Sequence, residues 1–141
     1  MDNKRFYLRL IEESIVRMGT NSFLIKGWSL TAIGGLITLY ITKINYSWAR
    51  NLLLLCLAVC IIFWFNDAYY LYQERKFRKL YNKARRLREE DIDFNMSPPK
   101  DSKLCFLKCA FRPVFCSSYI IVLLILLILI VHEFHIHIVI R

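Results

Sequence analysis

The stretch from residue 52 to residue 72 reads LLLLCLAVCIIFWFNDAYYLY and is the most informative part of the chain. Asp67 is its only charged residue. A helix rises 1.5 Å per residue, so about 20 apolar residues cross the roughly 30 Å hydrocarbon core of a bilayer. Residues 23–42 and 114–139 form two further apolar stretches of comparable or greater length. We therefore predict three transmembrane helices: span one (residues 23–42), span two (52–72) and span three (114–139).

The composition agrees with a small integral membrane protein. Of the 141 residues, 57% are hydrophobic, and the mean hydropathy of +0.38 exceeds that of ordinary soluble domains. Only four glycines and three prolines are present, which excludes collagen-like and loop-rich disordered chains. A soluble protein would need more polar chain to cover three such helices than remains here. The predicted fold class is all-α integral membrane, with a single membrane domain over residues 1–141.

Lysine and arginine gather in two segments, and this distribution predicts the orientation. Residues 1–20 and 73–112 hold most of the basic residues, which exceed the acidic ones by 20 to 11 in the whole chain. The loop between spans one and two holds only Lys43 and Arg50, and the C-terminal end holds only Arg141. Because cytoplasmic loops are enriched in lysine and arginine, we predict that both basic segments are cytoplasmic. The N-terminus then lies inside and the C-terminus outside.

Both cytoplasmic segments are predicted to contain helices. Residues 1–20 place apolar side chains at spacings of three and four, which is typical of an amphipathic helix; the members are Phe6, Leu10, Ile11, Ile15 and Met18. Beyond span two the helical pattern continues without glycine or proline, so we predict one helix over residues 52–90 that projects about 25 Å past the membrane. Pro98 and Pro99 cannot continue it.

The projecting helix carries a strongly basic surface. Its basic residues are Arg75, Lys76, Arg78, Lys79, Lys83, Arg85, Arg86 and Arg88, with no acidic residue among them after Arg75. Three interpretations remain open. The run can be a topology signal that lies against anionic lipid, a docking surface for an acidic protein or a nucleotide or nucleic-acid signal, or the lining of an anion-conducting vestibule. The acidic cluster at residues 89–93 that follows it is able to pair with a neighbouring subunit.

Charged residues inside predicted spans mark candidate functional positions, because they are costly in hydrocarbon. Lys26 lies about one turn inside span one, and Asp67, beside Asn66, lies at a similar depth in span two. Three interpretations remain open. Lys26 and Asp67 reach the interface separately, they form an ion pair that locks the two spans together, or Asp67 serves a pore or a proton path.

Span one also carries a small-residue stripe, formed by Gly27, Thr31 and Gly35, with Gly34 and Thr38 beside it. Small residues on one face allow helix backbones to approach closely in membranes. The stripe predicts a helix–helix contact, and either span two or another subunit is a suitable partner.

No catalytic, cofactor or metal site is predicted. The spacing of Cys105, Cys109 and Cys116 provides no fourth zinc ligand nearby. The tail with His132, His135 and His137 lacks the H-E-x-x-H pattern, and a polar end of span three explains it better. Phosphate-binding loops and catalytic triads are also missing from the sequence, so an enzyme is not expected.

Two stretches of the chain resemble a family of small bacterial multi-span membrane proteins without an established biochemical activity. They are residues 15–31 (IVRMGTNSFLIKGWSLT) and 63–81 (FWFNDAYYLYQERKFRKLY), and residues 93–97 (DFNMS) also fit. The resemblance implies a multi-pass protein of the bacterial inner membrane. It marks signature positions, namely Asn21, Lys26, Trp28, Asp67, Glu74, Arg75 and Arg78.

More loosely, the chain is similar in size and architecture to small transmembrane effectors of anti-phage defence systems. The sequence-based hypothesis is therefore a homo-oligomer in the lipid bilayer that acts as a pore- or channel-like effector, with the basic cytoplasmic helix as its input surface. The alternative is a non-conducting scaffold that recruits a cytoplasmic acidic protein or nucleic acid to the membrane.

Overall fold

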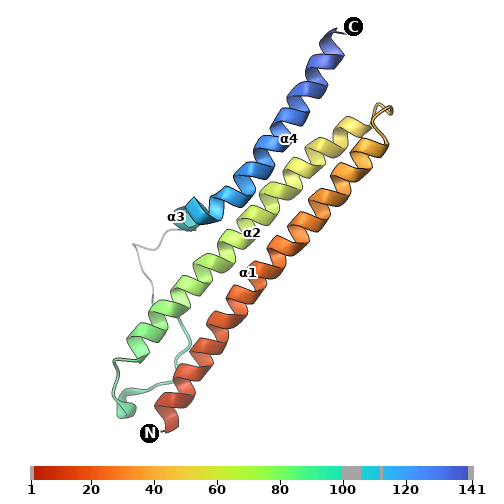
Figure 1. The fold of residues 1–141 in the computed structure, drawn as a ribbon. Coiled ribbons are helices and arrows are strands. Elements are labelled where there is room, and N and C mark those ends of the chain that lie inside the picture. Colours follow the sequence, from red (N-terminus) through yellow and green to blue (C-terminus); the bar gives the residue numbers. More distant parts are fainter. Residues whose placement is uncertain (1, 100–105, 112, 140–141) are drawn as a thin grey trace.

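A computed structural model describes residues 2–99, 106–111 and 113–139, and its described elements are helical. They are α1 (Asp2–Thr42), α2 (Ala49–Ala84), the short 3₁₀ helix η1 (Glu89–Asp91), α3 (Phe106–Ala110) and α4 (Pro113–Val139). Figure 1 shows α1 and α2 as an antiparallel hairpin, with α4 alongside the half of α2 nearer the α1–α2 turn. The two termini lie at opposite ends of the elongated molecule.

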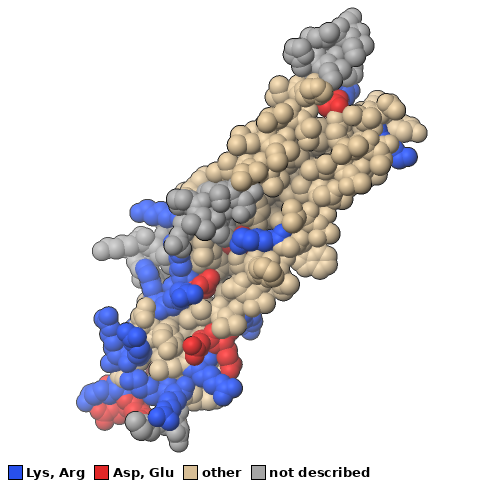
Figure 2. Space-filling model, in the orientation of Figure 1, with Lys and Arg blue, Asp and Glu red and all other residues tan. Residues whose placement is uncertain are grey.

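Two helices are long and apolar enough to cross a membrane, namely α1 and α2. The apolar part of α4 whose side chains are described, Tyr119–Glu133, is shorter than these. In Figure 2 the charged side chains gather at the end of the molecule that holds the N-terminus, and a broad belt with few charges follows. The prediction of an all-helical chain is therefore confirmed for the described residues, and two of the helices are long and apolar enough to span a membrane. Membrane insertion and the third span remain predictions.

The N-terminal amphipathic segment and span one form one continuous helix, which differs from the separate elements expected. α1 contains 41 residues, about 60 Å at 1.5 Å per residue and twice the thickness of a hydrocarbon core. Its first half packs against the far half of α2 through Tyr7, Ile11, Leu80 and Ala84, all buried. The segment therefore belongs to a two-helix stalk (residues 2–20 with 73–84) that extends from the apolar belt.

α2 ends at Ala84, six residues before the predicted end at residue 90. The chain then turns and folds back, so that Ile92 and Met96 pack against the stalk core. Two hydrogen bonds hold this return segment: Lys4 Nζ donates to the Leu87 carbonyl at 2.6 Å, and Tyr7 Oη donates to the Asn95 carbonyl at 2.5 Å. Burial of these apolar side chains outweighs further helix formation, which would have left them in water.

The return segment leads towards α3, which packs on α2 where the apolar belt begins. Ala110 of α3 lies against Ala68, both buried, and Trp64 Nε1 donates to the Ala110 carbonyl at 3.1 Å. α4 then packs through Tyr119 and Leu126. The cluster they join combines residues of α1, α2 and α4, so the three helices share one core.

Candidate functional site

The most unusual group in the apolar belt is the carboxylate of Asp67, which is 0% exposed. Lys26 Nζ of α1 lies 2.7 Å from Asp67 Oδ2. The hydroxyl of Ser22, also on α1, donates a hydrogen bond to Asp67 Oδ1. From α4, Tyr119 Oη donates to Asp67 Oδ2 at 3.3 Å. We call these four residues the polar node. It joins α1, α2 and α4 through a single carboxylate.

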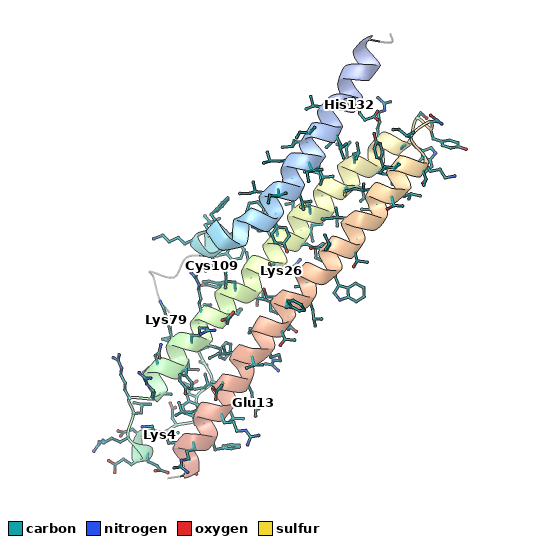
Figure 3. All side chains as sticks on the ribbon, viewed as in Figure 1. Lys4, Glu13, Lys26, Lys79, Cys109 and His132 are labelled. Carbon is teal, nitrogen blue, oxygen red and sulfur yellow. The ribbon has the colours of Figure 1, made fainter. Side chains whose placement is uncertain are left out.

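The node satisfies a charge that would otherwise be expensive to bury. An ionised carboxylate accepts hydrogen bonds only, and all three neighbours are donors, so the arrangement suits the charged form of Asp67. Lys26 Nζ also donates to Ser22 Oγ at 3.0 Å. Among the described residues, no buried side-chain nitrogen or oxygen lacks a hydrogen-bond partner. Figure 3 shows Lys26 between α1 and α2, midway along the hairpin. Of the three interpretations left open by the sequence, this geometry is that of the ion pair.

Asn66 does not belong to the node. Its amide Nδ2 donates to the Ile62 carbonyl, one turn back on the same helix, at 2.9 Å, and the side chain is exposed. Neighbouring residues on a helix point about 100° apart, so Asn66 turns away when Asp67 faces α1. The two residues that the sequence grouped together therefore have separate surroundings.

The small-residue stripe of α1 faces outward, away from α2. Gly27, Thr31 and Gly35 are exposed, and a Cβ atom built on either glycine would meet no other atom within 4 Å. The Thr31 hydroxyl bonds only to the Gly27 carbonyl of its own helix, at 3.1 Å. The sequence left two partners open for this stripe, span two and another subunit. Span two does not contact it.

The predicted basic surface is divided among several environments. Arg78 pairs with Glu74 at 2.7 Å, and Arg75 Nη1 lies 3.5 Å from the thiol of Cys109 in α3. Lys79 lies nearby on α2 and is partly buried. After the helix end, Arg85 and Arg86 are exposed, whereas Arg88 pairs with Glu90 at 2.7 Å and Asp91 at 3.1 Å. A single continuous basic face is therefore not present among the described residues, and the turn at residues 85–86 is one exposed part of the basic segment.

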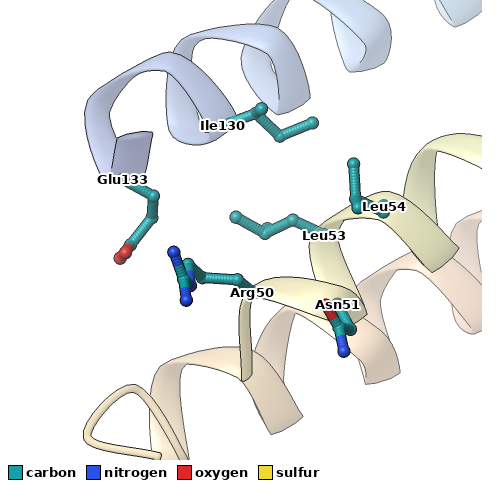
Figure 4. A pocket seen from close by; sticks show the side chains of 6 residues that line it. All are labelled: Arg50, Asn51, Leu53, Leu54, Ile130 and Glu133. Atoms are coloured by element: carbon teal, nitrogen blue, oxygen red, sulfur yellow. The ribbon is translucent and has the colours of Figure 1, made fainter. Parts of the chain in front are cut away.

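A second polar contact lies at the opposite end of the apolar belt. The Tyr40 hydroxyl of α1 donates to the carboxylate of Glu133 in α4. Figure 4 shows Arg50 of α2 and Glu133 pointing toward one another across a cavity of about 220 Å³. This contact ties α4 to the hairpin at the end away from the polar node.

The stalk tip is held by a buried tyrosine. Burial, with a smaller contribution from the nearby negative charge of Asp93, raises the pKa of Tyr7 above its usual 10.0. The hydroxyl therefore remains a donor to the Asn95 carbonyl throughout the physiological pH range. Phe94, which lies between Asp93 and Asn95 in the sequence, adopts a positive φ of 52° and contacts the rings of Phe6 and Tyr7.

The cysteines and histidines do not form a ligand set among the described residues, where no group of three or more His, Cys, Asp or Glu is close enough to hold a metal ion. Cys109 is buried beside Arg75, and His132 is exposed. Cys105 and the side chains of Cys116, His135 and His137 lie outside the described part of the chain.

Two residues of the polar node, Ser22 and Tyr119, and the contact between Tyr40 and Glu133 were not predicted from the sequence. Ser22 precedes Lys26 by four residues and therefore shares its helix face, so helical spacing alone was enough to find it. No pattern in the sequence indicated Tyr119, because its position along the bundle relative to Asp67 depends on how α4 packs against α2. Glu133 and Tyr40 were missed for the same reason.

Comparison of the chain with family models, with curated proteins and with solved structures gave no match.

Proposed function

We propose that this protein is a multi-pass protein of the bacterial inner membrane that assembles as a homo-oligomer and acts as a pore-like effector. α1, α2 and α4 are its three spans, and the stalk extends into the cytoplasm. The exposed basic turn at Arg85 and Arg86 receives the activating signal, a negatively charged protein, nucleotide or nucleic acid. Anti-phage defence is the biological setting that the architecture suggests, by analogy alone.

The small-residue stripe carries this proposal. Isolated in a bilayer, it would present glycines and threonine hydroxyls to lipid, although apolar side chains make better contact with acyl chains. In membranes such stripes serve close helix packing. Around a symmetry axis, copies of α1 would bring the stripes together, and the hydroxyls of Thr31 and Thr38 would then supply the polar groups that a narrow pore requires.

Current across a planar bilayer is the direct test of the proposal. Purified full-length protein is expected to give discrete conductance steps, and Thr31→Val is expected to reduce the unit conductance several-fold, because it replaces a pore-facing hydroxyl with a methyl group of the same size. Ile62→Leu, at an exposed position of α2, is the matched control and should conduct normally. Absence of current from correctly assembled protein would exclude the pore and leave the scaffold.

The orientation gives a separate prediction. Alkaline phosphatase is active only in the periplasm, so a fusion after residue 139 is expected to be active and a fusion after Arg88 inactive. A cytoplasmic green fluorescent protein at the same two positions serves as the complementary control. The reverse pattern would contradict the proposed orientation with the N-terminus inside.

The alternative, a non-conducting scaffold, draws support from the exposed arginines at the stalk tip. Arg85 and Arg86 lie directly beyond the end of α2, and both are exposed. Charge reversal there should abolish capture of an acidic partner under either function. Only the pore hypothesis also predicts loss of current.

A further inference from the structure

Two exposed side chains of the α1–α2 hairpin carry polar groups without a partner in the described part of the chain. Trp28 of α1 is 67% exposed, and its indole Nε1–H donates no hydrogen bond among the described residues. Asn66 of α2 is also exposed; its Nδ2 donates to the Ile62 carbonyl, and no described group donates to its Oδ1. One side chain therefore offers a donor and the other an acceptor.

This donor and this acceptor lie at nearly the same level along the hairpin. The contact between Lys26 and Asp67, at 2.7 Å, aligns the two helices. Trp28 follows Lys26 by two residues, about 3 Å towards the α1–α2 turn. Asn66 precedes Asp67 by one residue, about 1.5 Å in the same direction because α2 runs antiparallel to α1. Their levels therefore differ by only about 1.5 Å.

Both side chains point to the side of the hairpin opposite α4. On α1, Leu30 lines a groove with Tyr119 of α4, and Trp28 lies two residues, about 200° around the helix, from Leu30. On α2, Trp64 stacks on Tyr119, and Asn66 again lies two residues away, about 200° around the helix. We call the side that carries Trp28 and Asn66 the open face.

In the proposed orientation the open face meets acyl chains. Trp28 lies five residues inside predicted span one and Asn66 six residues inside predicted span two, about 7–9 Å from the nearer end. An amide without a hydrogen-bond partner is costly in hydrocarbon, and asparagine side chains in membranes hydrogen-bond across helices. The open face therefore requires a polar partner at this depth.

A second copy of the chain supplies that partner with the correct geometry. A two-fold axis along the membrane normal keeps every residue at its own level, and it makes the contact self-complementary. When two open faces meet, the rotation places α1 of one copy against α2 of the other. Trp28 of each copy then lies opposite Asn66 of the other.

We infer that two copies of this chain pair through the open face, and that Trp28 Nε1–H of each copy donates to Asn66 Oδ1 of the other. The symmetry produces two equal hydrogen bonds. Ile62, one turn from Asn66 on the same face, is 58% exposed and supplies apolar contact beside them.

This two-fold pair is distinct from the contact proposed for the small-residue stripe. Gly35 lies seven residues, about two turns, from Trp28, so the open face and the stripe share an edge. Gly27 lies about 100° from Trp28 and stays outside the pair. The inference rests on the proposed insertion of α1 and α2 in a single orientation. It deepens the proposed homo-oligomer by adding a two-fold pair, which the stripe joins into a larger assembly.

Photo-crosslinking of the full-length protein in cell membranes tests the contact. Trp28→p-benzoylphenylalanine is irradiated, covalent dimers are isolated on a denaturing gel, and the attached peptide is identified by mass spectrometry. Attachment to the segment around Asn66, residues 62–70, is expected. Leu30→p-benzoylphenylalanine is the matched control, because Leu30 is 69% exposed but faces the side of α4. Absence of dimers, or attachment of Trp28→p-benzoylphenylalanine to another segment, would overturn the pair.

Dissociation of the purified protein in a detergent dilution series measures the hydrogen bonds. Trp28→Phe removes the N–H and keeps an aromatic ring, and Asn66→Leu removes the acceptor. Each is expected to raise the dissociation constant about tenfold, since two bonds between membrane helices are lost. The double variant is expected to lose no more, because both substitutions remove the same bonds. Trp48→Phe, at a 45% exposed tryptophan outside the predicted spans, is the matched control.

Additive effects of the two substitutions, or wild-type dissociation of both single variants, would overturn the hydrogen bonds. An indole that is anchored at the headgroups would likewise leave dissociation of Trp28→Phe unchanged. If these tests fail while Gly27→Leu still weakens association, the two-fold pair is wrong and the stripe contact stands. A wild-type chain that is monomeric in the membrane and in detergent would contradict the proposed homo-oligomer itself.

Discussion

Lys26→Met is expected to destabilise the protein by about 3–5 kcal/mol, the usual loss when a buried ion pair loses one partner. The substitution leaves the Asp67 carboxylate 0% exposed and removes its only cation within the node. The hydroxyls of Ser22 and Tyr119 remain as donors but carry no charge. Either the carboxylate stays ionised without a counter-charge, or it takes up a proton and weakens the hydrogen bonds that it accepted.

The reciprocal change, Asp67→Leu, is expected to cost less. Lys26 is 38% exposed, and its long flexible side chain can turn towards a headgroup when the carboxylate is gone. The pair Lys26→Met with Asp67→Leu is expected to recover part of the stability lost in Lys26→Met, because no buried charge remains. If the double variant is more stable than Lys26→Met alone, the two residues are energetically coupled.

Unfolding of the purified protein in detergent, followed by tryptophan fluorescence during heating, measures these differences. Arg78→Gln is the matched control, because it breaks an ion pair of the same 2.7 Å length between Arg78 and Glu74 at the exposed stalk. Surface pairs of this kind contribute about 0.3–0.5 kcal/mol. A coupling energy near zero between Lys26 and Asp67 would show that Lys26 reaches the interface independently.

Asp67→Asn separates stability from conduction. The amide keeps the size of the side chain and can still accept from Ser22 or Tyr119. If Asp67 has only a structural role, the Asp67→Asn protein that assembles should have the same unit conductance as the wild type. Loss of current in fully assembled Asp67→Asn protein would instead make Asp67 a conduction residue and contradict the account given above.

Local periodicity was sufficient to predict the helices and to place Lys26 and Asp67 at the same level along the hairpin. Lys26 and Asp67 were matched in depth simply by counting residues from the ends of two antiparallel spans, and their side chains do meet. The helix boundaries were less predictable. Nothing in the run from Arg85 to Glu90 disfavours a helix, and α2 ends at Ala84 because Ile92 and Met96 pack on Tyr7 and Ile11, residues about 80 positions earlier.

Contacts of α4 were beyond sequence reasoning for a related reason. A uniformly apolar helix has no face that marks its partner, so neither its rotation nor its level against α2 could be inferred. Tyr119 and Glu133 are the two polar groups that fix both, one at each end of the belt. Tyr119 bonds to Asp67 of predicted span two, and Glu133 bonds to Tyr40 of predicted span one. In a uniformly apolar helix, such polar side chains determine how the helix is aligned against its neighbours.

Gly27→Leu and Gly35→Leu are expected to weaken self-association at least about tenfold, and to leave the folded single chain intact. A Cβ atom at either position meets nothing within 4 Å, both glycines are exposed, and leucine favours a helix over glycine by up to about 1 kcal/mol. Any loss must therefore arise between copies, where bulky side chains would keep the α1 backbones apart.

Size-exclusion chromatography with light scattering, over a dilution series in detergent, measures the association. Gly19→Leu is the matched control, because a Cβ atom at Gly19 also meets nothing within 4 Å, but this residue is half-buried on the stalk, outside the small-residue stripe. Unchanged thermal unfolding of all three variants would show that the chain itself is unaffected. Wild-type association of Gly27→Leu and Gly35→Leu would remove the stripe from the interface, and with it the observation on which the pore proposal depends. Selective loss of association together with loss of current would link assembly to conduction through the same face of α1.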